Sequence, residues 1–522
     1  MTVAIVAIVV VTAAGAAAIA ADVAAVIAAD AAVVIAIAAV AVVVAAAAAA
    51  AAADRHLYPY DGASAWKRHL HLTLWRGPRR PQRRGPDLQA AGFTKGQQLL
   101  SEITYPRDAA EITTLANGMT VCMERLPYLH SASAGIWIRT GSANETAAES
   151  GIAHFLEHLF FKGTKTRNVH EIMEAVESRG GQLNAFTARE YTCLYVKVLD
   201  KYTATGIEIL ADIVKNSLFA DLEKERNVIL EEIASVEDTP DEYVHDLMTE
   251  HHWPDHPLGR SISGTAESVS ALEYDHVVDF FQRWYRPENM VFSIAGNIDT
   301  QAVLEQVRRE FEGISRAAAE GPGEAPRFNG GIVSVERDIA QSHITLAFPA
   351  PSLYDDRKYA FDMTSNILGG GSTSRLFERI REDEGLAYSI YTFDSFYMRS
   401  GAIGVYAAVA PQQLGKTLDL TFEELRKLRD GGISEEELEM NREQIKGGML
   451  MAMESTFTRM ARMAKSIMYY GKLIPMSDIV EKVDAITAAD IQSCAVSIFQ
   501  PDQCALLVLG PKSDTMPDRI AL

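Results

Sequence analysis

The strongest constraint on the fold of this 522-residue chain is a pattern that occurs twice at a constant distance. Residues 269–272 (Val-Ser-Ala-Leu) lie 214 positions before residues 483–486 (Val-Asp-Ala-Ile). With the same offset, residues 285–289 precede residues 499–503, and each copy then enters an apolar stretch that ends in glycine. A constant offset of this kind indicates an internal duplication, so we expect two homologous domains.

Both halves mix strand and helix patterns, which predicts two α+β domains. Alternating apolar residues predict strands at residues 133–140, 193–198, 344–348 and 403–409. Helical periodicity predicts helices at residues 358–368, 419–429 and 435–451.

One short motif in the first half predicts a metal site. Residues 154–158 read His-Phe-Leu-Glu-His. On a helix, His154, Glu157 and His158 share one face. Two imidazoles suit zinc, and a carboxylate beside them that is not a ligand can accept a proton from water. The order H-x-x-E-H is that of the inverted zinc-peptidase motif.

A catalytic zinc usually has three protein ligands, so a third must come from elsewhere in the chain. The best candidate region is residues 223–233, whose apolar residues fit a helix with one packed side. Glu225 and Glu232 lie two turns apart on the same face of that helix, whereas we expect Glu223 and Glu231 on a solvated surface. Spacing alone does not choose between Glu225 and Glu232.

Together these motifs resemble the pitrilysin family of zinc metallopeptidases, which includes insulin-degrading enzyme and the mitochondrial processing peptidase. The family pattern is H-x-x-E-H followed by E-x-x-x-x-x-x-E, and the resemblance covers roughly residues 110–512. It implies one Zn²⁺ per chain held by His154, His158 and Glu232. It also implies that Glu157 is the general base and that Glu225 supports the site from behind the ligands.

The same resemblance assigns substrate-binding residues. Residues 180–187 are similar to the family's strand beside the metal, where Asn184, Ala185 and Phe186 would hold a peptide as an added strand. Arg381 and Tyr388 match an Arg–Tyr pair that contacts substrate in the family. Because the second half has no H-x-x-E-H, we expect it to hold substrate without binding metal.

The resulting hypothesis is a zinc-dependent metalloendopeptidase that hydrolyses peptides or presequence-like segments. The alternative is a noncatalytic scaffold subunit of the same fold, like the core proteins of respiratory complexes. Such subunits typically lose parts of the metal motif, and here every part is present. Family members of this length resemble half of a clamshell-type chamber, so we expect a homodimer or a heterodimer with a related subunit.

These patterns divide the chain into five segments. We expect an Ala/Val-rich segment, a basic linker, the catalytic zinc peptidase domain, a Gly/Ala/Pro-rich linker and an inactive substrate-holding domain, at residues 1–53, 54–108, 109–312, 313–331 and 332–514. Apolar stretches in the first segment are long enough to span a bilayer, and the basic residues after them suit a cytoplasmic flank. Three interpretations remain for that segment: a membrane anchor, an unusual targeting segment, or low-complexity sequence from an overextended reading frame.

Composition limits the possible partners and the possible metal ligands. A formal net charge of −20 argues against nucleic acid as a partner. The four cysteines are far apart, which argues against a Cys-type zinc site and a disulfide framework, and we expect the folded part to be cytoplasmic. His251, His252 and His256 form a rival metal cluster, but no acidic residue lies nearby in helical register, so we expect them to be structural.

Overall fold

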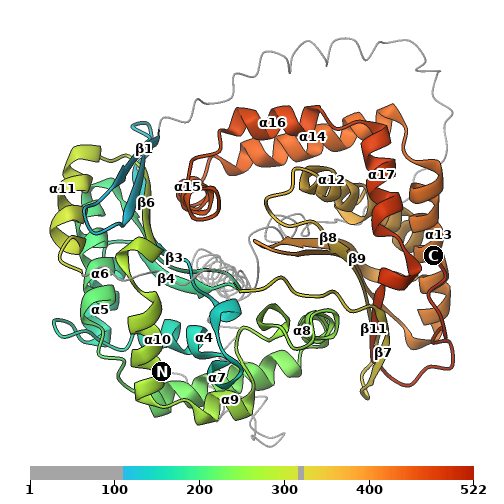
Figure 1. Cartoon of the computed structure of the whole chain (residues 1–522), viewed down its shortest axis with the longest axis horizontal. Helices are drawn as coiled ribbons and strands as arrows, with labels where there is room; N and C mark the ends of the chain where they lie inside the picture. Colours follow the sequence, from blue (N-terminus) through green and yellow to red (C-terminus); the bar gives the residue numbers. More distant parts are fainter. Residues whose placement is uncertain (1–109, 315–322) are drawn as a thin grey trace, which may run out of the picture. The chain divides into compact units, whose positions relative to one another are not determined.

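The computed structural model describes residues 110–314 and 323–522. The first of these ranges forms a six-stranded sheet of order β1-β2-β6-β3-β5-β4, in which β2 and β6 are parallel (Figure 1). Its strands are β1 (Ala110–Thr114), β2 (Thr120–Arg125), β3 (Ser131–Ile138), β4 (Gln182–Thr187), β5 (Thr192–Leu199) and β6 (Met290–Gly296). Its helices are α4 (Ile152–Leu159), α5 (Val169–Glu177), α6 (Thr203–Asn216), α7 (Leu222–Glu237), α8 (Pro240–His252), α9 (Ala266–Ala271), α10 (Tyr274–Trp284) and α11 (Thr300–Phe311).

The second range forms a five-stranded sheet of order β7-β11-β8-β10-β9, in which β7 and β11 are parallel. Its strands are β7 (Gly331–Glu336), β8 (Ser342–Ala350), β9 (Ala387–Phe396), β10 (Gly401–Val409) and β11 (Ala505–Gly510). Its helices are α12 (Lys358–Gly369), the π-helix η8 (Phe377–Asp383), α13 (Leu414–Gly431), α14 (Glu435–Ala452), α15 (Thr456–Tyr470), α16 (Met476–Asp484) and α17 (Ala488–Ile498). The mixture of helices and sheets confirms the α+β class.

The two sheets share one topology, which confirms the duplication. The order β2-β6-β3-β5-β4 in the first sheet repeats as β7-β11-β8-β10-β9 in the second. In each, the first pair is parallel and the remaining neighbours are antiparallel. Helices α10 and α17 begin at residues 274 and 488, which is the offset of 214 found in the sequence.

The predicted strands and helices are present, with shifted ends. The strand expected at residues 133–140 is β3, which ends two residues earlier at Ile138. The next N–H, from Arg139, still donates to the carbonyl of Asn289, which already belongs to the 3₁₀ turn before β6. The helix expected at residues 419–429 belongs to a longer helix, α13, whose first turn continues directly from a 3₁₀ turn.

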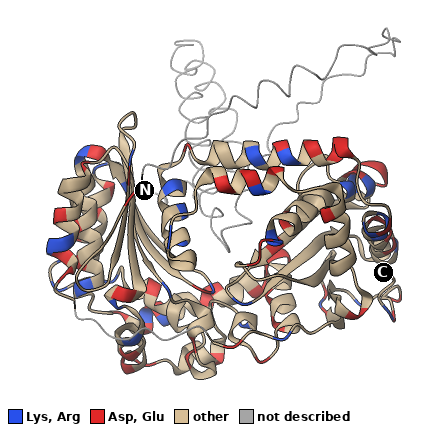
Figure 2. Ribbon diagram, turned by 45° about the horizontal axis from the view of Figure 1, so that its top comes forward, with Lys and Arg blue, Asp and Glu red and all other residues tan. Residues whose placement is uncertain are grey.

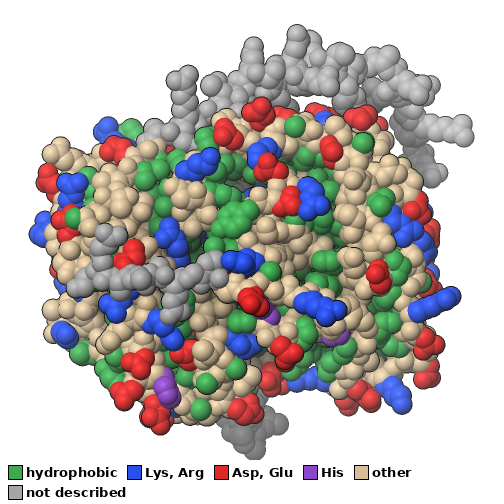
Figure 3. Space-filling model, viewed as in Figure 1, with side chains coloured by type: hydrophobic (Ala, Val, Ile, Leu, Met, Phe, Trp, Pro, Cys, Tyr) green, Lys and Arg blue, Asp and Glu red, His purple; other side chains and the backbone are tan. Residues whose placement is uncertain are grey.

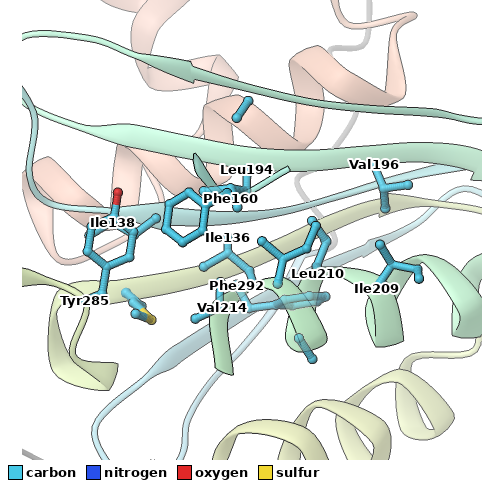
Figure 4. Packing of buried hydrophobic residues seen from close by; sticks show 14 of the residues in the cluster. Ile136, Ile138, Phe160, Leu194, Val196, Ile209, Leu210, Val214, Tyr285 and Phe292 are labelled. Carbon is cyan, nitrogen blue, oxygen red and sulfur yellow. The ribbon is translucent and has the colours of Figure 1, made fainter. Parts of the chain in front are cut away.

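The core of the first half lies between its sheet and its helices. Figure 4 shows Ile136, Leu194 and Phe292 of the sheet packed against Leu210 of α6. Phe160, directly after α4, joins this core with its ring centroid 5.3 Å from that of Tyr285. The helix that carries the H-x-x-E-H motif is therefore anchored in the core at its carboxyl end.

Each sheet is covered on its other face by a helix from the other half. Helix α15 packs on β6 and β3 of the first sheet, and α8 packs on β11 and β8 of the second. Both faces of the central strands are therefore buried, and every residue of β6 is buried. This explains why such strands read as continuous apolar runs rather than as clean alternation.

Polar contacts fix this exchange of helices. Ser133 and Thr456 are joined by a hydrogen bond of 2.8 Å between their hydroxyl oxygens, and the Ser293 hydroxyl donates to the Met460 carbonyl at 2.8 Å. Arg459 of α15 forms a buried ion pair with Glu124 of β2 at 2.5 Å. The predicted domain boundary at residues 313–331 did not anticipate this arrangement. Each half supplies one helix that covers the sheet of the other half.

The charged residues lie mainly on the helices and connecting segments, while the strands hold few of them (Figure 2). On the face seen in Figure 3, acidic and basic side chains are mixed rather than segregated. Among the helices of residues 110–314 and 323–522, none combines the length and the apolarity needed to cross a bilayer. The predictions for residues 1–53 and 54–108 lie outside the described residues.

Candidate metal centre

Helix α4 presents the predicted motif on one face. One side of this helix is fully buried in the core and consists of Ile152, Phe155, Leu156 and Leu159. The positions between these residues therefore face away from the core. His154, Glu157 and His158 occupy those positions and are partly buried. The rings of the two histidines lie edge to face with their centroids 4.7 Å apart. The spacing i, i+3, i+4 thus produces the shared face that the sequence predicts.

A buried carboxylate fixes the start of this helix. Glu145 accepts hydrogen bonds from the N–H groups of Gly151 and Ala153, each at 2.9 Å, and Arg260 donates to its backbone carbonyl. Burial raises the pKa of Glu145 to about 8, against the lowering effect of those two N–H donors. Gly151 has a φ of 91°, and a Cβ there would lie 2.6 Å from the Ser263 carbonyl oxygen, so this position requires glycine.

Helix α7 brings Glu232 to the two histidines. Its Oε2 atom lies 3.7 Å from Nε2 of His154 and 3.5 Å from Nε2 of His158. Glu225 instead lies behind His158, with its Oε2 atom 3.4 Å from Nδ1. The side chain of Glu232 is 47% exposed and that of Glu225 is 3% exposed. The structure therefore separates two residues that spacing left equivalent, and it leaves Glu223 and Glu231 exposed.

The three side chains fit a zinc ion. One ligand atom from each of His154, His158 and Glu232 lies within 4.8 Å of the others. Ligands about 2.0–2.1 Å from a tetrahedral zinc are about 3.3 Å apart, close to the 3.5 and 3.7 Å separations between the carboxylate and the imidazoles. The contact of Glu225 with Nδ1 of His158 leaves Nε2 as the atom that faces the centre.

The electrostatics of the two histidines differ. Burial, followed by the charge of His158, lowers the pKa of His154 to about 4. Burial also opposes the charged form of His158, but Glu232, Glu157 and Glu225 outweigh it and raise its pKa. The pKa of Glu232 is lowered, because its interactions with His158 exceed the effect of burial. The centre thus combines a neutral imidazole with an anionic carboxylate, which suits a divalent cation.

Glu157 does not join this set of three but is held beside it. Its Oε2 atom accepts a hydrogen bond of 2.6 Å from the hydroxyl of Thr187, the last residue of β4. Burial raises the pKa of Glu157 to about 7, while Thr187 and His158 act in the opposite direction. Sequence reasoning did not single out Thr187. The signal available was its place directly after the predicted substrate-binding residues.

The predicted substrate strand is the edge of the first sheet. Strand β4 pairs with β5 on one side and has no strand on the other within the described residues. Asn184 is exposed, and its Oδ1 atom accepts from the N–H of Ala185 at 2.8 Å. The side chain of Ala185 is buried, and Phe186 packs edge-on against Trp137 with ring centroids 5.7 Å apart. The exposed side chains of this strand are therefore those of Gln182 and Asn184.

Arg381 and Tyr388 contact each other in the second half. The guanidinium of Arg381, on η8, lies 4.9 Å from the ring centroid of Tyr388, near the start of β9. Tyr388 is 79% exposed, and β9 is the edge strand equivalent to β4. Their roles in substrate binding stay predictions.

Two histidines of the rival cluster make structural contacts. His252, at the end of α8, is buried and stacks on Phe328 with ring centroids 5.1 Å apart. His256 accepts a hydrogen bond from the N–H of Leu258 in the following turn. Within the described residues, the cluster suited to a metal ion comprises His154, His158 and Glu232 and includes none of these histidines.

Comparison with known proteins gives a consistent result. A family model described as insulinase (peptidase family M16) matches residues 120–266, and one described as the peptidase M16 inactive domain matches residues 271–445. An uncharacterized zinc protease of Bacillus subtilis is 37% identical over 407 residues, covering 77% of this chain and 98% of the relative. One of Streptomyces coelicolor is 36% identical over 420 residues, covering 78% and 91%.

Solved structures agree on the fold. The crystal structure of a protease from Helicobacter pylori superposes with a TM-score of 0.73 at 22% identity, covering 78% of this chain and all of the other. A peptidase M16 inactive domain from Pseudomonas fluorescens superposes with a TM-score of 0.73 at 17% identity, with the same coverage.

Proposed function

Because the chain belongs to peptidase family M16, the insulinase family, we propose that it is a zinc-dependent metalloendopeptidase acting on peptides or presequence-like segments. The observation that carries the proposal is the convergence of His154, His158 and Glu232 with a fourth group, Glu157, beside them. His154, His158 and Glu232 would hold one Zn²⁺ per chain. The chemistry that Zn²⁺ supplies when bound is Lewis acidity, which makes water a stronger acid and polarises a peptide carbonyl.

The protein's own groups account for the remaining steps. Glu157 accepts a proton from the attacking water as the water oxygen bonds to the carbonyl carbon. It then returns that proton to the nitrogen as the C–N bond breaks, which gives a carboxylic acid and an amine; the acid passes its proton to the amine, so that a carboxylate and an ammonium group leave the site. A substrate lying along the free edge of β4 would add a strand to the sheet, which orients its backbone without demanding particular side chains.

The two family models match different halves of the chain, and this supports a peptidase with one metal-binding half. The insulinase model matches the half that holds the motif, and the inactive-domain model lies mostly in the half that lacks it. A scaffold subunit of the same fold is the alternative. It is disfavoured because the motif, Glu225 and Glu232 are all present and assembled.

The test uses the purified full chain, internally quenched peptides with both ends blocked, and zinc content measured by mass spectrometry. We expect wild type to cleave internal bonds, E157Q to keep zinc and lose cleavage, and H158A to lose both. Cleavage by E157Q at the wild-type rate would refute the role of Glu157. A folded wild type without zinc would favour the scaffold subunit.

We further propose that two subunits, identical or related, enclose the substrate, and that the folded part works in the cytoplasm. The four cysteines are buried thiols, in keeping with a reducing compartment. Light scattering on the purified chain, alone and with candidate related subunits, tests the dimer.

A further inference from the structure

Lys162 is connected to the metal centre through one intermediate side chain. Its Nζ atom lies 2.8 Å from Oε1 of Glu225. The other oxygen of that carboxylate, Oε2, lies 3.4 Å from Nδ1 of His158. Lys162 therefore reaches the outer nitrogen of His158 through Glu225, without touching His158, His154 or Glu232 itself.

The burial of Glu225 makes this cation necessary. The Glu225 side chain is 3% exposed, whereas that of Lys162 is 24% exposed. A buried carboxylate is costly unless a charge or hydrogen-bond donors compensate it. Lys162 supplies a full positive charge at hydrogen-bond distance, while the imidazole of His158 supplies a neutral donor when its other nitrogen binds a metal.

The backbone around Lys162 is held in place independently of the metal. The N–H of Lys162 donates to the carbonyl of Leu159 at 3.2 Å, which continues the end of α4. The loop that follows is tied to α6 by Asp212, whose carboxylate accepts from Thr164 at 2.8 Å, Thr166 at 2.6 Å and Arg167 at 2.8 Å. The ammonium group thus extends from a fixed position towards a fixed carboxylate.

We propose that Lys162 is a positioning residue of the metal centre, which holds the Glu225 carboxylate against Nδ1 of His158 and so keeps Nε2 directed towards His154 and Glu232. This inference rests on the proposed function, since it presumes that the centre binds zinc. It assigns to the metal centre a cation that acts only through the Glu225 carboxylate.

The test is zinc affinity, measured by competition with a chromogenic chelator on the purified full chain. Loss of a group that orients a histidine ligand typically costs 10- to 100-fold in metal affinity. We expect K162M to bind zinc about 10-fold more weakly and K162R to retain most of the wild-type affinity. Lys165, exposed in the same loop, provides the matched control K165M, which should not change affinity.

The variant E225Q distinguishes positioning from a general structural role. If Lys162 acts through the Glu225 carboxylate, K162M added to E225Q should cause no further loss of zinc affinity. An equal loss in both backgrounds, or K162M binding zinc as wild type does, would overturn the inference. If K162M does not fold, K162Q is measured in the same two backgrounds. Absence of zinc from wild type would instead overturn the proposed function, and this inference with it.

Discussion

Replacing Thr187 by valine removes the hydrogen bond to the proposed general base while keeping the shape of the side chain. The Thr187 hydroxyl donates to Oε2 of Glu157 at 2.6 Å and lies 3.4 Å from the Ala153 carbonyl oxygen. Within the described residues this is the one side-chain hydrogen bond found at Glu157. It engages Oε2 of the carboxylate that we propose as the general base.

The size of the effect follows from the charge and burial of the acceptor. A hydrogen bond to a charged group contributes about 1.5–3 kcal/mol. If all of it is lost in the transition state, kcat falls about 10- to 100-fold, since about 1.4 kcal/mol corresponds to a factor of ten. Substrate affinity should change little, because a substrate would contact the backbone of β4 rather than this hydroxyl. The loss should therefore appear in kcat and not in KM.

The assay is steady-state cleavage of an internally quenched peptide by wild type, T187V and T187S, with zinc content measured on each. We expect T187S, which keeps the hydroxyl, to recover most of the wild-type kcat. If T187V keeps the wild-type kcat with normal zinc, the hydroxyl does not orient Glu157. If T187S is as slow as T187V, the methyl packing rather than the hydrogen bond is responsible.

Two further predictions concern stability. Arg459→Met removes a cation that contacts the buried Glu124 carboxylate, so it should destabilise the chain by about 1.5–3 kcal/mol, measured by urea unfolding; an unchanged free energy of unfolding would contradict this. Burial, with the charges of Arg189 and His251, lowers the pKa of His252 to about 3. Between this pKa and the unfolded value near 6.5, the unfolded chain binds a proton at His252 and the folded chain does not. The free energy of unfolding therefore falls as the pH decreases from 6.5 towards 3. From pH 7 to pH 5, His252 alone should lower the free energy of unfolding by about 2 kcal/mol. Urea unfolding at the two pH values should show a correspondingly smaller loss in H252L. Equal losses in both proteins would contradict the lowered pKa of His252.

Local spacing predicted the parts of this molecule that depend on one helix or one strand. His154, Glu157 and His158 share a face because the helical repeat alone places them there. Glu225 and Glu232 share a face for the same reason. That Glu232 lies between the two histidines and Glu225 behind His158 depends on where α7 crosses α4, which no local pattern encodes. The contacts of Thr187 with Glu157 and of Lys162 with Glu225 also join residues from different elements.

The sequence also did not predict that α8 covers the second sheet and α15 the first, because this too depends on contacts between distant parts of the chain. Ser133 and Thr456 are partners although they are 323 positions apart, and each sits in a stretch whose own periodicity is satisfied by many arrangements. The apolar character of β6 and β11 did carry information, because a strand buried on both faces needs a cover on each. It did not identify which helix provides that cover.

The second half differs from the first at more than the missing H-x-x-E-H motif. Helix α14 begins 213 positions after α7, and the residue 214 positions after Glu232 is Lys446. The Lys446 ammonium pairs with Glu443 and with Asp484 of α16, each at 2.8 Å, so it connects α14 with α16. A cation at this position opposes metal binding even if histidines were restored on α12. The second half therefore differs from the first by a change of charge as well as by the missing motif.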